Sequence, residues 1–163
     1  MPAIILFAVA ITAAPLMPPP SPLAGLEGCW QVRGEVEGKP MSATARGSRK
    51  LGGRYLLLEL QGSNNNDSHD TAIIMADAGP GQLTGWWMDR FGGPGSAAGT
   101  GSVEADGFSI SYAYPSARFV NRFRRVGLGW DWRIDARPGG GKASLFARYT
   151  LRPARCPARF GVF

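Results

Sequence analysis

Apolar and polar residues alternate one by one through most of the chain, and this pattern restricts its possible folds more than any other feature. The clearest example is 130–137, where Trp130, Trp132, Ile134 and Ala136 alternate with four charged residues. Successive side chains of an extended strand point to opposite faces, so such a segment buries one face and exposes the other. Gly, Pro or β-branched patterns interrupt every long stretch that could otherwise form an amphipathic helix. The chain is therefore predicted to be all-β.

Ten segments carry this strand pattern or a shorter form of it. They are 30–36, 42–51, 54–61, 71–76, 83–89, 97–104, 108–114, 118–126, 130–137 and 144–152. Most connectors are short and contain the Gly, Pro, Asp or Asn residues that hairpin turns favour. An antiparallel meander of this many strands must protect its edges, and closure into a barrel removes them. We therefore predict an antiparallel up-and-down β-barrel of eight to ten strands.

The first 24 residues differ from the rest of the chain. No charged residue precedes Glu27, and 3–14 (AIILFAVAITAA) is an apolar run of signal-peptide length, shorter than the roughly 20 residues of a membrane span. The proline-rich stretch 15–22 is typical of an extended spacer. We predict an exported protein, periplasmic or extracellular, and an uncleaved N-terminal membrane anchor is the alternative. The predicted division is a signal peptide and spacer at 1–24, a barrel domain at 25–156 and a tail at 157–163.

Three motifs in order carry a resemblance to a known family. They are LEGCW at 26–30, LGGRY at 51–55 and WMD at 87–89, followed by Tyr149 near the end. The first contains the Gly-x-Trp signature of the calycin superfamily, the lipocalins and their relatives. Together with the strand pattern, 23–153 resembles a large bacterial family of exported calycin-like proteins of unknown function. The sequence departs from that family at 76–79, where ADAG replaces the usual Gly-Tyr-Asp-like turn.

The resemblance implies a role for Gly28 and Trp30 at one end of the barrel. In calycins the tryptophan of the signature closes that end, and a basic residue from the last strand packs over its ring. Arg148 or Arg152 of this chain would be that residue, through a cation–π contact.

The resemblance also implies a cavity, and the aromatic residues of the chain are its candidate walls. A barrel of eight to ten strands is wide enough either to be filled by its own side chains or to hold a small ligand. Trp86 and Trp87 are adjacent, so in a strand one points inward and the other outward. Plain core packing is the alternative for each candidate. The predicted lining is Tyr112, Tyr114, Phe119, Phe123, Trp130, Trp132 and Trp86. The predicted ligand is a small, mainly apolar molecule.

Signatures of catalysis and of cofactor or metal binding are mostly missing from the sequence. The single histidine, His69, lies in the polar segment 63–70, which is predicted to be a loop. No nucleophile-elbow, dinucleotide-binding or P-loop string occurs. We therefore predict no catalytic residue, no cofactor and no metal site. An enzyme that uses Tyr112 or Asp89 as acid or base inside the cavity rests on fold analogy alone.

The two cysteines are far apart in sequence, yet the predicted fold brings them together. Cys29 opens the first strand and Cys156 follows the last, and closing a barrel places those strands side by side. A disulfide there would stabilise the fold by about 4 to 5 kcal/mol in the chain-entropy model, provided the compartment is oxidising. Two unrelated thiols are the alternative.

Positive charge gathers in the C-terminal part of the chain. Residues 1–117 hold seven Lys or Arg and ten Asp or Glu, a net charge of −3, whereas 118–163 hold eleven and two, a net charge of +9. Alternation puts Arg118, Arg122 and Arg124 on one strand face, and Arg125 follows them. The alternative function is therefore a filled barrel whose arginines meet an anionic membrane or polyanion. Nucleic acid is a poorer candidate because the export segment argues against access, and no oligomeric state is predicted.

Overall fold

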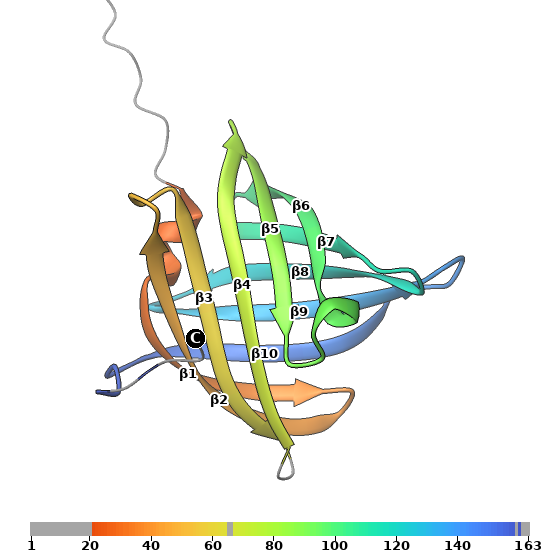
Figure 1. The fold of residues 1–163 in the computed structure, drawn as a ribbon, viewed down its shortest axis with the longest axis horizontal. Helices are drawn as coiled ribbons and strands as arrows, with labels where there is room; N and C mark the ends of the chain where they lie inside the picture. The colour runs from red at the N-terminus through yellow and green to blue at the C-terminus, as the bar shows by residue number, and fades with distance from the viewer. Residues whose placement is uncertain (1–20, 65–66, 159, 161–163) are drawn as a thin grey trace, which may run out of the picture.

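Ten strands form in the computed structural model, which describes residues 21–64, 67–158 and 160 (Figure 1). They are β1 (Gly28–Val36), β2 (Lys39–Lys50), β3 (Tyr55–Asn64), β4 (Asp67–Gly79), β5 (Gln82–Asp89), β6 (Ala97–Glu104), β7 (Gly107–Ala113), β8 (Ala117–Val126), β9 (Gly129–Pro138) and β10 (Ser144–Ala154). Each strand pairs antiparallel with the next, and β1 pairs with β10. This closes an up-and-down barrel, so the predicted fold is confirmed. Two short 3-10 helices, η1 (Pro22–Leu26) and η2 (Gly93–Gly95), lie outside the sheet.

The predicted loop at 63–70 is wrong for the residues that the structure describes. β3 and β4 continue to pair through this polar segment, with Ser63 opposite Ser68 and Asn64 opposite Asp67. Polar residues can occupy a strand when the neighbouring strand satisfies their backbone groups. The predicted loop therefore becomes the end of a long hairpin.

An aromatic stack fills one half of the barrel interior. Tyr149, Trp132, Phe123, Phe108 and Trp130 all point inward and are at least 94% buried. The ring of Trp132 lies 4.9 Å from that of Phe123 and 4.7 Å from that of Tyr149, and Phe108 stacks on Phe123 at 4.7 Å. Trp130 meets Phe108 edge to face at 5.9 Å. These rings pack against one another in the buried core.

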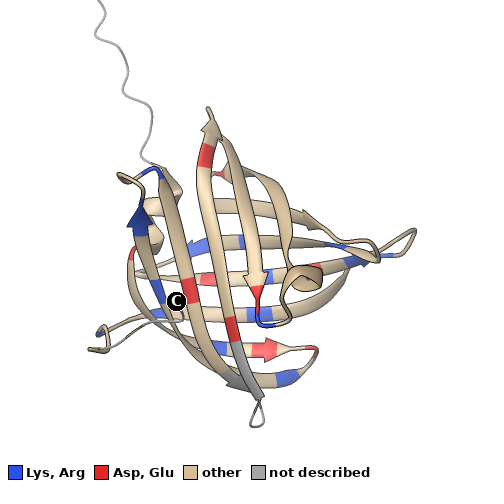
Figure 2. Ribbon diagram, viewed as in Figure 1, with Lys and Arg blue, Asp and Glu red and all other residues tan. Residues whose placement is uncertain are grey.

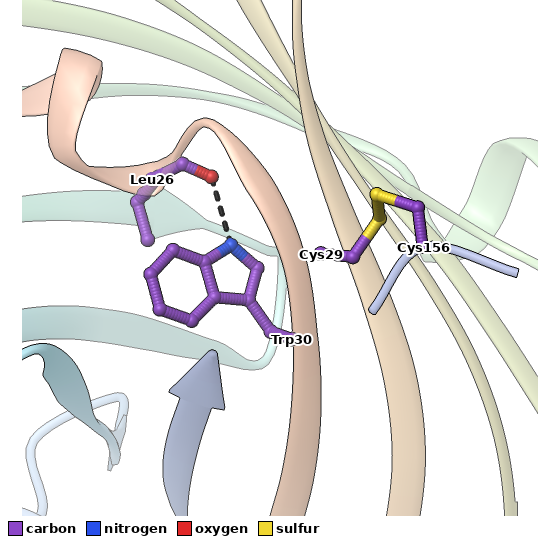
Figure 3. The surroundings of a disulfide bond; sticks show 4 residues. All are labelled: Leu26, Cys29, Trp30 and Cys156. Carbon is purple, nitrogen blue, oxygen red and sulfur yellow. Dashed lines mark hydrogen bonds between the residues drawn. A yellow bond between two sulfur atoms is a disulfide. The ribbon is translucent and has the colours of Figure 1, made fainter. Parts of the chain in front are cut away.

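The helix η1 covers one end of the barrel, which we call the closed end. Leu23 and Leu26 are fully buried in the core. The indole Nε1 of Trp30 donates to the Leu26 carbonyl at 2.9 Å, as Figure 3 shows. Gly28 joins η1 to β1 with a φ of +108°, a conformation that favours glycine. Since Leu23 belongs to this core, the packed structure begins before residue 25, and the rest of the predicted leader, 1–20, lies outside the described residues.

Neither Arg148 nor Arg152 packs over Trp30, so that expectation is wrong. Ala147, Tyr149 and Leu151 are the inward residues of β10, which turns the two arginines outward. The cation–π contact at the closed end is instead made by Arg125, whose guanidinium lies 5.1 Å from the centre of the Trp130 ring. Arg125 also donates to the Gly25 carbonyl at 3.0 Å, as does Trp130 Nε1 at 2.9 Å. Arg125 therefore attaches η1 to β9.

Replacing Arg125 with alanine is expected to destabilise the fold more than the same change at Arg124. The Arg125 variant loses a cation–π contact and hydrogen bonds to the Gly25 and Gly127 carbonyls, together about 1 to 2 kcal/mol. Arg124 makes only an exposed ion pair with Asp106 at 3.5 Å, a type that contributes little. Urea unfolding of the two variants measures the difference. Equal losses of stability would contradict the role given to Arg125.

A disulfide joins Cys29 to Cys156 across the seam of the barrel (Figure 3). The pairing of β1 with β10 brings Cys29 opposite Ala154, two residues before Cys156. The two Cα atoms are 5.1 Å apart. The predicted bond is confirmed, and the reading of two unrelated thiols is wrong.

Candidate functional site

A cavity of about 270 Å³ opens at the end of the barrel away from η1, which we call the open end. Its walls come from the C-terminal ends of β5 and β7, the N-terminal ends of β8 and β10, the middle of β9, and η2. The lining residues are Trp87, Asp89, Pro94, Gly95, Tyr112, Tyr114, Ser116, Phe119, Asn121, Ile134 and Phe146. Most of this surface is apolar and aromatic, as is typical of small-molecule sites.

Small residues in β5 and β6 make room for one wall of the cavity. A Cβ atom added at Gly99 would lie 2.7 Å from Cδ1 of Tyr112, and one added at Gly85 would lie 2.8 Å from its hydroxyl. The ring of Tyr112 therefore rests directly on the backbone of these two strands. This close approach explains why glycine recurs at inward positions of β5 and β6.

Three polar side chains at the cavity have identified partners. Asp89 accepts hydrogen bonds from Trp87 Nε1 at 3.2 Å and from the backbone N–H of Phe91 at 2.9 Å. The Tyr114 hydroxyl donates to the Gly95 carbonyl at 3.0 Å and so holds η2 over the cavity. Asn121 is 2% exposed, and its Oδ1 accepts from Trp132 Nε1 at 2.9 Å. An indole N–H can only donate, so the Nδ2 group of Asn121 is the part left for a ligand.

The two tyrosines of the cavity are hydrogen-bond donors at neutral pH. Burial raises the pKa of Tyr114 to about 12, and the nearby charge of Asp89 adds to the effect. Burial, with a smaller contribution from Tyr114, raises the pKa of Tyr112 above its ordinary range. Both hydroxyls thus stay protonated, which suits polar contacts with a ligand better than base catalysis.

The structure divides the seven aromatic residues predicted to line a cavity into three groups. Tyr112, Tyr114 and Phe119 do line it. Phe123, Trp130 and Trp132 belong to the aromatic stack deeper in the barrel. All three are buried inside the barrel, where they pack in the core and do not line the cavity.

Trp86 is the third group, and its assignment to the cavity is wrong. Its side chain lies on the outer face, 38% exposed, with its ring 6.2 Å from that of Tyr55. The register of β5 on β4 and β6 points Trp87 inward instead, because Gly85 and Leu83 share its face. Adjacent strand residues always point to opposite faces, and only the tertiary structure shows which of the two is buried.

Phe146 and Asn121 are site residues that the sequence pattern did not reveal. A register irregularity in β10 between Leu145 and Ala147 interrupts the alternation, and Phe146 then lines the cavity. Its ring meets that of Phe119 edge to face at 5.1 Å. Asn121 is a polar residue at an inward position of β8, and alternation among the neighbouring arginines and phenylalanines is the signal that places it there.

Blue segments recur along β8, β9 and β10 in Figure 2, and the arginines of these strands, apart from Arg125, lie at outward positions. Arg122 lies opposite Arg133, and Arg133 lies opposite Arg148, so the three form a row across the strands. We call these three residues and Arg124 the arginine face. Arg118 also points outward, 3.5 Å from the Ser111 hydroxyl, whereas Arg125 lies at the closed end.

Acidic partners neutralise much of the arginine face. Asp135 pairs with Arg122 at 2.8 Å and with Arg133 at 2.7 Å. Glu35 pairs with Arg148 at 3.2 Å. The face is therefore a network of ion pairs rather than a row of unopposed cations.

The stability contributed by Asp135 is expected to depend on pH. The hydrogen bond from Arg133 holds the pKa of the Asp135 carboxyl below its ordinary value, and the charge of Arg122 acts in the same direction. The contribution is fully present above the unfolded pKa, about 3.9, and is lost as the pH falls through the lower folded pKa. Urea unfolding at pH 6 and pH 3 should show a smaller acid-induced loss for Asp135→Asn than for wild type. The control is Asp131→Asn on the same strand, and equal losses in wild type and Asp135→Asn would contradict the assignment.

Two searches of the described residues bear on other kinds of site. Within 21–64 and 67–158, no group of three or more His, Cys, Asp or Glu lies close enough to hold a metal ion. In the same part of the chain, no helix is long and apolar enough to cross a membrane.

The chain folds as a closed, antiparallel, up-and-down barrel of ten strands. No family model and no curated protein matches its sequence. Among solved structures it resembles the crystal structure of Rv2717c from M. tuberculosis, with a TM-score of 0.62, 13% identity, and coverage of 82% of this chain and 95% of that chain. It also resembles the S-type phycobiliprotein lyase CPES from Guillardia theta, with a TM-score of 0.58, 12% identity, and coverage of 83% and 92%. At these identities the likeness establishes the fold, and the resemblance to a large bacterial family stays a prediction.

Proposed function

We propose that this protein is an exported binding barrel that holds a small, mainly apolar molecule in the cavity at its open end. The observation that carries the proposal is the division of the interior. The aromatic stack and η1 fill the closed half, while aromatic walls at the open end surround about 270 Å³ of space. That volume is just below the roughly 300 to 1,000 Å³ of typical ligand sites, which favours a small ligand.

Binding fits this cavity better than catalysis does. Its tyrosines stay protonated at neutral pH, and Asp89 already accepts two hydrogen bonds from the protein. A binding role without bond-breaking is therefore the function we propose.

Export is part of the proposal, and the disulfide supports it. A bond between Cys29 and Cys156 persists best in an oxidising compartment such as the periplasm or the extracellular space. The predicted signal peptide within 1–24 would deliver the chain there, and without cleavage it would act as an anchor. The mass of the mature protein recovered from its natural host tests both forms. A full-length chain in the cytoplasm with two free thiols would contradict export.

A dye-binding experiment tests the cavity. The neutral apolar dye N-phenyl-1-naphthylamine is expected to bind one site with a saturable rise in its emission. Ser116→Trp places a large side chain at the cavity wall and is expected to weaken dye binding at least tenfold. Ser102 faces outward on β6, opposite Ser109, so Ser102→Trp is the matched control that should bind like wild type. Failure of the wild-type protein to bind, or equal binding by both variants, would contradict a ligand site at the open end.

A second candidate function uses the arginine face. The four residues of the arginine face line a hollow of the outer surface together with Asp131. An anionic membrane or polyanion would have to compete with Asp135 and Glu35 for these arginines. Cosedimentation with vesicles of phosphatidylglycerol and phosphatidylcholine tests this candidate. Binding that falls with salt and is lost in the double variant Arg124→Gln and Arg148→Gln would support it. Absence of binding at low salt would exclude the membrane.

A further inference from the structure

The cavity at the open end combines one carboxylate with several aromatic rings, and this combination indicates which class of ligand it can bind. Among the described residues that line it, Asp89 is the only one with an acidic or basic side chain other than the tyrosines, and none of them is a Lys, Arg or His. Five others are aromatic, namely Trp87, Tyr112, Tyr114, Phe119 and Phe146. The carboxylate places a negative charge beside the faces of these aromatic rings. A cation, rather than an anion, is the charged group that such a site would attract.

The aromatic rings surround the cavity from several sides. Phe119 meets Tyr114 at an interplanar angle of 85° and Phe146 at 82°. Trp87 and Tyr112 meet at 67°. Rings at such angles to their neighbours resemble an aromatic cage, in which the negative ring faces attract an ammonium group. Edge-to-face packing of this kind is also common in cores. The carboxylate of Asp89 is therefore the feature that favours a cation site over ordinary core packing.

Asp89 is held in position without being neutralised. Its two hydrogen-bond donors, the indole of Trp87 and the backbone of Phe91, are both uncharged. None of the ion pairs among the described residues includes Asp89. A Cβ atom at Gly95 would collide with its carboxylate, which shows that η2 packs directly on it. The carboxylate is therefore fixed beside the cavity with its charge available to a ligand.

We propose that the ligand is a small organic cation, a protonated amine or quaternary ammonium attached to a compact apolar body. This inference rests on the proposed function, because it requires the cavity to hold a ligand. The ammonium group would lie near Asp89 and the rings, and the apolar body would contact Ile134 and Phe146. Asn121 Nδ2 and the Tyr112 hydroxyl would serve as donors to any polar atom on that body, whereas the Tyr114 hydroxyl already donates to the Gly95 carbonyl.

A pair of isosteric ligands tests the proposal on the wild-type chain. Phenyltrimethylammonium and tert-butylbenzene have nearly the same shape and differ in one positive charge. Competition against N-phenyl-1-naphthylamine is expected to show at least tenfold tighter binding of the cation. Equal binding, or tighter binding of tert-butylbenzene, would overturn the cation assignment while leaving the ligand cavity intact. If neither the dye nor either ligand binds, the proposed function fails as well.

Two aspartate variants locate the source of the preference. Asp89→Asn is expected to reduce the preference for the cation at least fivefold while tert-butylbenzene still displaces the dye. That second readout also reports whether the cavity survives the loss of a hydrogen-bond acceptor. Asp131 is exposed on β9, so Asp131→Asn removes the same charge outside the cavity and should keep the preference. A loss of preference in both variants, or in neither, would show that Asp89 does not supply it.

Discussion

Replacing Trp132 with alanine is expected to lower the free energy of unfolding by about 4 to 5 kcal/mol, which is close to the total stability of many domains. Trp132 is 1% exposed and lies at the centre of the aromatic stack. Its ring contacts those of Phe123, Tyr149 and Trp87. Truncation would leave a large cavity and would also deprive Asn121 of its hydrogen-bond donor.

Urea unfolding with a matched control measures this effect. Trp86→Ala makes the same change at an outward position and is expected to cost less than about 1.5 kcal/mol. Trp132→Phe keeps an aromatic ring in the stack and loses the hydrogen bond, so an intermediate loss is expected. If Trp132→Ala is no more harmful than Trp86→Ala, then the stack does not form the core of the fold.

Removing the disulfide is expected to have an effect of similar size. The bond joins residues 127 positions apart, and a cross-link over so long a loop restricts the unfolded chain by about 4 to 5 kcal/mol. Double replacement of Cys29 and Cys156 by alanine should therefore lower Tm by about 10 to 15 °C. Calorimetry of the oxidised protein, the reduced protein and the variant provides the test.

The reduced wild-type protein serves as the internal control for that prediction. It should unfold near the temperature of the double variant, because both lack the cross-link. An unchanged Tm after reduction, with both thiols shown to be free, would mean that pairing of β1 with β10 holds the seam without the bond.

Alternation along the sequence was enough to predict the barrel. The charges of β9 fall on one face and its aromatic residues on the other, and hairpin-length connectors leave little choice of topology. The polar segment 63–70 misled the prediction because strand pairing depends on what the neighbouring strand offers. The composition of a segment does not show which residues the neighbouring strand places beside it.

The site was harder to predict because depth within a barrel is a tertiary property. Inward aromatic residues look alike in sequence, whether they line a cavity as Phe119 does or pack in a core as Phe123 does. What separates them is η1, which closes one end and lets the neighbouring rings stack. The register of the strands also decides which of Trp86 and Trp87 points inward. A register irregularity in β10 likewise places Phe146 at the cavity.

The contact that Arg125 makes at the closed end was also not predicted from the sequence. A calycin-like resemblance led to the expectation of an arginine from the last strand over the signature tryptophan. The cation–π contact instead joins Arg125 to Trp130, two residues that follow each other closely around the β8–β9 turn. This contact joins two residues that are close in sequence. It was not predicted because the resemblance implied an arginine from the last strand instead.

Native mass spectrometry of the mature protein, purified from the exported fraction of its natural host, shows whether the barrel carries a bound ligand. We expect a reproducible added mass of one small molecule per chain, which denaturation releases and Ser116→Trp strongly reduces. Identification of the released molecule would also show whether it carries a positive charge. A compact protein that carries no added mass and excludes N-phenyl-1-naphthylamine would contradict the claim that this barrel binds a ligand at its open end.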